Sequence, residues 1–140
     1  MTLVQDAITS RPVSVWLAQE IQTVRRHLET ARHRAARTLI RTPHLRVVLV
    51  AIREGGEVSE HTAEGPITIH ILDGCIELYV QGRRHTLGAG MLMSLEGGIS
   101  HSVASGEGGL FLLTVLNLPQ PIAGRRTPVG WSGPPRPSAD

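Results

Sequence analysis

The chain has 140 residues, 41% of them hydrophobic, and a formal net charge of +2. This length suits one domain with a substantial hydrophobic core, and no apolar run approaches the roughly 18 residues of a membrane-spanning helix. The N-terminus has no basic start followed by an apolar core, so a secretory signal is not expected. The single cysteine excludes an internal disulfide, and a cytoplasmic location is the default expectation.

The charge is divided into three blocks along the chain. Residues 1–46 carry eight arginines against three acids, residues 47–118 carry three arginines against eight acids, and residues 119–140 carry three arginines against one acid. The basic and acidic blocks can attract each other, within one protomer or across a dimer. We therefore expect no nucleic-acid partner, and the four aromatic residues also offer little for base stacking.

An amphipathic helix is predicted over residues 13–36. Apolar residues recur at steps of three and four from Trp16 to Ala35, and Ser14 stands where it could cap the first turn. Arginines occupy the other faces, so the helix is expected to pack on the domain or on a partner subunit. A helix lying on a membrane surface is the alternative, but the apolar face is narrow for that role, and no membrane partner is expected.

From residue 37 the pattern changes to short strands separated by glycine-rich turns. Residues 67–72 and 75–80 alternate on either side of Asp73 and Gly74, which predicts a β-hairpin with its turn at that dipeptide. Many short strands of this kind indicate a sandwich or barrel. The Pro-, Gly- and Arg-rich tail after residue 118 is expected to be extended or disordered. The other predicted strands are 37–41, 45–53, 84–87, 91–95, 101–104 and 110–118.

One stretch resembles the first signature motif of the cupin superfamily. In that motif a glycine is followed by five residues, His-x-His, three or four residues, a glutamate, six residues and a glycine. Here Gly55 is followed by five residues and His61, and Gly74 closes the motif at the family distance. The Gly-Pro-(aliphatic)-Thr run at residues 65–68 is similar to that of small single-domain cupins.

A second stretch resembles the other cupin motif, which runs from a glycine through a Pro-x-Gly turn to a histidine. Here Gly90 leads through Gly98 to His101, and Glu96 stands in place of the turn proline. The resemblance covers residues 37–118. It implies an all-β fold, a cupin-type double-stranded β-helix or jelly-roll barrel, between an N-terminal helical segment (1–36) and a C-terminal tail (119–140). It also implies a homodimer.

The resemblance implies a partly degenerate metal-binding motif. Metal-binding cupins supply three histidines and a glutamate, and this chain keeps the first as His61 and the last as His101. The second histidine position is Ala63 and the glutamate position is Ile67. Two imidazoles alone would hold a divalent metal (Fe, Mn, Ni or Zn) only weakly, because such sites normally have three protein ligands.

Three residues are candidates for a third metal ligand. Glu57 shares the parity of His61 if the intervening chain is extended, and Glu64 follows the vacated second position. His70 lies on an alternating strand, so it faces away from the barrel if Ile69 faces inward. Each of the three is more simply explained as a solvated surface residue.

Two classes of function remain open, as does the question of whether the protein is an enzyme. The first is a small-molecule-binding barrel with an unknown ligand in a pocket lined by His61 and His101. The second is a metal-dependent enzyme, of the oxygenase or isomerase type, with the same two residues as metal ligands. The two apolar ligand positions favour the first class. A regulator that binds a partner through the basic helix and tail is a further alternative. Cys75 has no base to pair with and is not expected to be a nucleophile.

Overall fold

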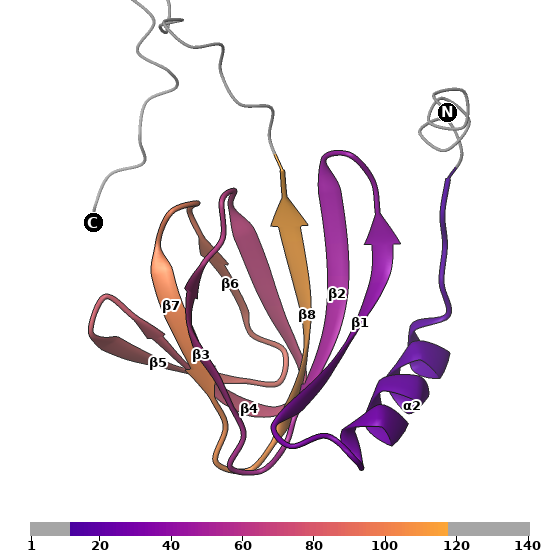
Figure 1. Cartoon of the computed structure of the whole chain (residues 1–140), viewed down its shortest axis with the longest axis horizontal. Coiled ribbons are helices and arrows are strands. Elements are labelled where there is room, and N and C mark those ends of the chain that lie inside the picture. Colours follow the sequence, from indigo (N-terminus) through magenta and orange to yellow (C-terminus); the bar gives the residue numbers. More distant parts are fainter. Residues whose placement is uncertain (1–11, 118–140) are drawn as a thin grey trace, which may run out of the picture.

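The computed structural model describes residues 12–117, which form one helix and eight antiparallel strands curled into an open barrel (Figure 1). The tail predicted after residue 118 lies outside the described residues. No helix within residues 12–117 has the length and apolar character needed to cross a membrane. The elements are α2 (Leu17–Leu28), β1 (Arg34–Arg41), β2 (Leu45–Ile52), β3 (Glu57–Thr62), β4 (Ile67–Val80), β5 (Arg83–Gly88), β6 (Leu92–Leu95), β7 (Ser100–Ala104) and β8 (Gly109–Leu116).

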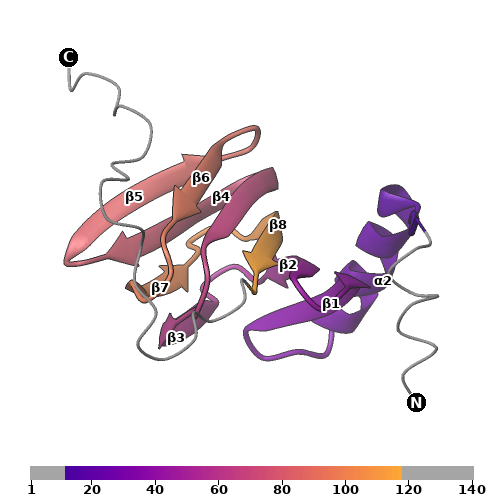
Figure 2. The same cartoon turned by 90° about the horizontal axis from the view of Figure 1, so that it is seen from above.

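The barrel is built from two sheets that share β4. The first sheet runs β1-β2-β8-β4-β6 and uses the first half of β4; the second runs β5-β4-β7-β3 and uses the second half. The ends of the curled path are β1 and β3, which do not pair with each other in the described chain. Viewed from above, these two strands flank the open side of the barrel (Figure 2). The fold is therefore the all-β, jelly-roll architecture expected from the sequence.

The predicted hairpin at Asp73 and Gly74 is wrong, because β4 runs through this dipeptide as one continuous strand. Gly74 has φ +74° and pairs with Gly109 of β8, next to a register shift at residues 71–73. A Cβ at Gly74 would lie 2.3 Å from the carbonyl oxygen of Gly108, so only glycine fits. The Asp-Gly pair marks the bend where β4 leaves the first sheet and enters the second.

The hairpin of this region lies further along the chain. Gln81 and Gly82 both have positive φ, 50° and 78°, and they connect β4 to β5 in a two-residue turn, as type I′ turns do. This turn falls between the strands predicted at residues 75–80 and 84–87. The other predicted strands are present within a few residues of their expected bounds, while β3 was not predicted as a strand.

The helix is shorter than predicted, since it spans Leu17–Leu28 rather than residues 13–36. Trp16 is the N-cap and no side chain caps the first turn, so Ser14 does not have the predicted role. At the other end, Arg53 Nη1 donates to the carbonyl oxygens of residues 28, 29 and 31, at 2.9, 3.3 and 2.9 Å. Carbonyls at a helix C-terminus need such donors, and Arg53 stabilises the end of α2 by providing one.

Two hydrophobic clusters cover opposite faces of the first sheet. On β2, Val48 and Val50 point into the barrel, while Leu49 and Ala51 point outward against Val24 of α2. This alternation follows from the two-residue period of a strand. Ala35, which suggested a continuing helix, belongs to the outer cluster as a residue of β1. The helix therefore closes the outer face, and the inner face is left to line the barrel.

Candidate functional site

The two predicted histidines lie side by side on the concave face of the second sheet. His61 of β3 and His101 of β7 are register partners, and their ring centroids are 4.3 Å apart at an interplanar angle of 61°. His101 is 3% exposed, whereas His61 is open to solvent. Strand pairing thus brings together two side chains that are forty positions apart in the sequence.

Each imidazole is oriented by a backbone carbonyl two residues earlier in the chain. Nδ1 of His61 lies 3.0 Å from the carbonyl oxygen of Ser59, and Nδ1 of His101 lies 3.0 Å from that of Ile99. A carbonyl oxygen can only accept, so Nδ1 donates in both rings. This leaves Nε2 of each ring for another molecule, as an acceptor in the neutral ring and as a donor in the charged one.

The two histidines line a cavity of about 450 Å³ inside the barrel. Apolar side chains, most of them from β2, β4, β7 and β8, make up much of its wall, and Thr38 and Ser59 add hydroxyl groups. Arg34 and Arg46 also line it. A mostly apolar cavity with a few polar groups has the composition typical of a small-molecule site. The main apolar residues are Val48, Val50, Ile69, Val103, Phe111 and Leu113.

The two arginines of the cavity were not identified from the sequence. A signal was available for Arg46, which has the parity of Val48 and Val50 on the strand predicted at residues 45–53. Arg34 carried no such signal, since it fell in the segment predicted as helix. In the structure it begins β1 and lines the cavity from the open side.

None of the three candidate third ligands lines this cavity. A register shift between Val58 and His61 breaks the parity expected for Glu57, which pairs instead with an outward-facing residue of β7 and is exposed. Glu64 is also exposed. His70 is exposed between the buried residues Ile69 and 71, so it faces away from the barrel, as the strand alternation predicted.

The side chains present do not fit the metal site of the family. Within residues 12–117 no group of three or more His, Cys, Asp and Glu side chains is arranged to hold a metal ion. Ala63 and Ile67, at the vacated ligand positions, both pack with the hydrophobic core, and Ile67 is 4% exposed. Since the two histidines have no third protein donor beside them, a tightly held metal is not supported by this donor set.

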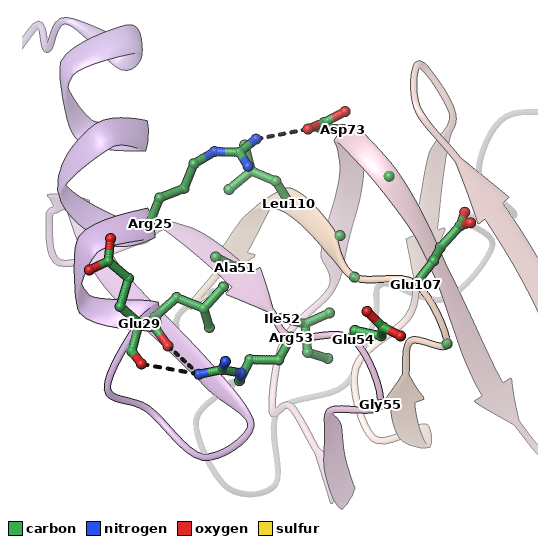
Figure 3. A pocket seen from close by; sticks show the side chains of 15 residues that line it. Arg25, Glu29, Ala51, Ile52, Arg53, Glu54, Gly55, Asp73, Glu107 and Leu110 are labelled. Atoms are coloured by element: carbon green, nitrogen blue, oxygen red, sulfur yellow. Dashed lines mark hydrogen bonds and ion pairs between the residues drawn. The ribbon is translucent and has the colours of Figure 1, made fainter.

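A larger hollow, of about 770 Å³, lies outside the barrel between α2 and the loops at the bend of the sheets (Figure 3). Its cationic groups are already engaged by the protein. Arg25 Nη2 lies 2.8 Å from Oδ2 of Asp73, and Arg53 binds the carbonyls at the end of the helix. The bond from Arg25 lowers the pKa of Asp73 below its ordinary value. These contacts attach α2 to the sheet, so we assign this hollow a structural role.

Cys75 of β4 lies outside the cavity and is partly buried. Desolvation is the main cause that raises the pKa of its thiol, and the carboxylates of Glu77 and Glu107 raise it further. A thiol with a raised pKa stays protonated at neutral pH, and the thiolate is the nucleophilic form. The structure therefore gives no support to a role for Cys75 as a nucleophile.

Comparisons with known proteins agree with this architecture. Residues 48–116 match the family described as Cupin domain. Among curated proteins, no sequence matches the chain. A cupin superfamily protein from Desulfitobacterium hafniense matches with a TM-score of 0.59 and 18% identity, over 76% of this chain and 91% of that one.

Two other structural matches differ in how much of the matched protein they cover. KdgF from a Halomonas species has a TM-score of 0.57 and 19% identity, over 62% of this chain and 81% of that chain. Salicylate 1,2-dioxygenase from Pseudaminobacter salicylatoxidans has a TM-score of 0.65 and 14% identity, over 73% of this chain but only 34% of that chain. At these identities the likeness concerns the fold alone. With its cupin domain at residues 48–116 and its jelly-roll barrel, the chain belongs to the cupin superfamily.

Proposed function

We propose that this protein binds a small organic molecule in the barrel cavity, with His61 and His101 as its polar contacts. The observation that carries the proposal is the paired arrangement of the two rings, with centroids 4.3 Å apart and both Nδ1 atoms bound to backbone carbonyls. Both Nε2 atoms are then available to one bound molecule. A volume of about 450 Å³ falls within the range of roughly 300–1,000 Å³ that is usual for ligand pockets.

A metal-dependent oxygenase or isomerase is less well supported. That reading needs a third protein ligand beside His61 and His101, and Glu57, Glu64 and His70 do not line the cavity. The likeness to salicylate 1,2-dioxygenase concerns only the fold, at 14% identity. The binding reading needs no group beyond those that line the cavity.

The proposal is tested by a fragment screen followed by NMR, using uniformly labelled full-length protein. We expect bound fragments to shift the ring resonances of His101 and His61. We expect His61→Ala to weaken the binding of these fragments while the protein stays folded. His70→Ala is the matched control, because His70 also lies on a barrel strand but faces away from the cavity. Fragments that bind only at the outer hollow would contradict the proposal. Stoichiometric iron, manganese, nickel or zinc that is lost in His61→Ala would favour the metal enzyme instead.

A further inference from the structure

The barrel cavity carries basic side chains and no acidic one. Its described lining includes Arg34, Arg46, His61 and His101, but neither aspartate nor glutamate. Both arginines come from the basic block of residues 1–46, whereas none of the eight acids of residues 47–118 lines the cavity. The acids of the domain therefore lie elsewhere, and the positive potential of the two guanidinium groups is not cancelled within the cavity.

Arg46 is unsatisfied within the described chain. Its Nε atom is buried, with no hydrogen-bond partner among residues 12–117. A buried donor without a partner destabilises the fold, and a charged group more so. A sequence keeps such a group most readily where another molecule satisfies it, and the acceptor that suits a guanidinium best is an anionic oxygen group.

Strand register places Arg46 toward the same end of the cavity as the two histidines. On the first sheet, Arg46 pairs with Val115 of β8, six positions beyond Gly109. On the second sheet, His101 pairs with Val80 of β4, six positions beyond Gly74. Gly109 and Gly74 pair at the bend, so Arg46 and His101 are equally far from the bend along their two sheets. Arg34 lies near the bend, in the register row of Gly109.

Three arginines at the junction of α2 with the first sheet differ from Arg46 in this respect. Arg25 binds Asp73, Arg37 binds Glu20, and Arg53 binds three backbone carbonyls. Each of them has a protein acceptor that accounts for its position. Protein contacts thus account for these three cations, whereas the buried Nε atom of Arg46 has no such contact among residues 12–117.

We propose that the ligand of this cavity is an organic acid, with its carboxylate bound by the guanidinium of Arg46, next to His61 and His101. Its apolar body packs on Val50, Ile69 and the other inward-facing side chains of the wall. The guanidinium supplies charge-assisted hydrogen bonds to the carboxylate, and the apolar wall excludes water around them. This inference rests on the proposed function and specifies the chemical class of the molecule bound.

The test uses three small probes in NMR titrations of the full chain at low salt. Benzoate combines a carboxylate with an apolar ring, benzamide keeps the ring without the charge, and acetate keeps the carboxylate without the ring. We expect benzoate to shift the Arg46 Nε–H and His101 ring resonances saturably, and to bind at least about tenfold more tightly than either other probe, about 1.4 kcal/mol. Arg46→Met should reduce the affinity for benzoate to that for benzamide. Arg83→Met makes an equal charge change at an exposed position of β5 and should leave the benzoate affinity within about twofold of wild type.

The outcomes separate this inference from the proposed function. Benzamide binding as tightly as benzoate, with the same histidine shifts, would overturn the organic-acid inference and leave the cavity as a small-molecule site. Acetate binding as tightly as benzoate would mean that the apolar wall does not contribute to binding, and the ligand would not need an apolar body. Benzoate shifts confined to the outer hollow, or no shift in the cavity with any probe, would overturn both proposals. The comparison of probes on the wild-type protein holds even if Arg46→Met fails to fold.

Discussion

The two faces of the first sheet carry arginines in opposite circumstances. On the outer face, Arg25, Arg37 and Arg53 each bind a carboxylate or a backbone carbonyl, and together they connect α2 to the strands. On the inner face, Arg46 has a buried Nε atom without a partner in the described chain. The same residue type therefore supports the architecture on one face and is unsatisfied on the other.

This difference separates the arginines that stabilise the fold from the arginine on which the proposed binding site depends. Groups that are fully paired contribute to folding, whereas a buried donor without a partner opposes it. The larger hollow, beside α2, is lined by cations that are already paired, while the smaller cavity holds Arg46 and the two histidines. The volume of a hollow alone therefore does not select the cavity that we propose as the site.

The largest effect is expected from the outer cluster. Leu49 is completely buried between β2 and α2, so Leu49→Ala should lower the free energy of unfolding by about 2–5 kcal/mol. Urea denaturation followed by circular dichroism measures this loss. Benzoate affinity of the folded fraction should stay within about twofold, because Leu49 faces away from the cavity.

The neighbouring residue on β2 provides a matched comparison. Val50 points into the cavity, where it has open space on one side. Val50→Ala should therefore cost less than Leu49→Ala for each carbon atom removed, since fewer contacts are lost. An equal or greater cost for each carbon at Val50 would mean that the inner face is packed as densely as the outer one, and the proposed division between the faces would fail.

A smaller effect, of opposite sign on the two faces, is expected from the arginines. Arg46→Met should raise the free energy of unfolding by up to about 1 kcal/mol, because it removes an unsatisfied buried donor and keeps the apolar stem. Arg37→Met should lower it by up to about 1 kcal/mol, because it breaks the partly exposed pair with Glu20. Both are measured by urea denaturation without ligand. Loss of stability in Arg46→Met would show that Arg46 is satisfied in solution and would weaken the case for an anionic ligand.

Much of the fold could be predicted from the sequence, because strand alternation and glycine spacing are local patterns. The hairpin was assigned to the wrong dipeptide for a physical reason. Asp73 and Gly74 have the composition of a tight turn, but the contact that decides the outcome is the approach of Gly108 to Gly74, which lies 34 positions away in the chain. A bend between sheets and a hairpin turn both require a glycine with positive φ, so the local pattern cannot separate them.

Some features of the candidate site could also be predicted from local sequence patterns, and others depend on distant contacts. The cupin motifs predicted His61 and His101 as site residues, and pairing between β3 and β7 brings these two side chains together. The parity of Glu57 could not be predicted, because the register shift between Val58 and His61 depends on the partner strand. Arg46 could be assigned to the inner face from its strand parity. Its lack of a partner, however, depends on which acids lie nearby in three dimensions.

The smallest effect concerns the bond that joins α2 to β4, and it depends on pH. The hydrogen bond and charge of Arg25 hold the pKa of Asp73 below its ordinary value, so the folded state favours the ionised carboxylate. This contribution to stability is fully present above the unfolded pKa of about 3.9 and is lost as the pH falls through the lower folded pKa. Asp73→Asn keeps the side-chain shape and an acceptor but removes the charge. It should therefore lower the melting temperature slightly at pH 7 and have no effect once the wild-type carboxyl is protonated.

The ion pair is exposed, so its strength should also depend on salt. The Debye length is about 8 Å at 0.15 M and shorter at higher ionic strength, so the difference in melting temperature at pH 7 should shrink when salt is raised well above 0.15 M. Arg25→Gln is the matched variant and should follow the same pH and salt dependence. A difference between wild type and Asp73→Asn that persists unchanged at acidic pH would mean that packing at the bend, and not the ion pair, stabilises this junction.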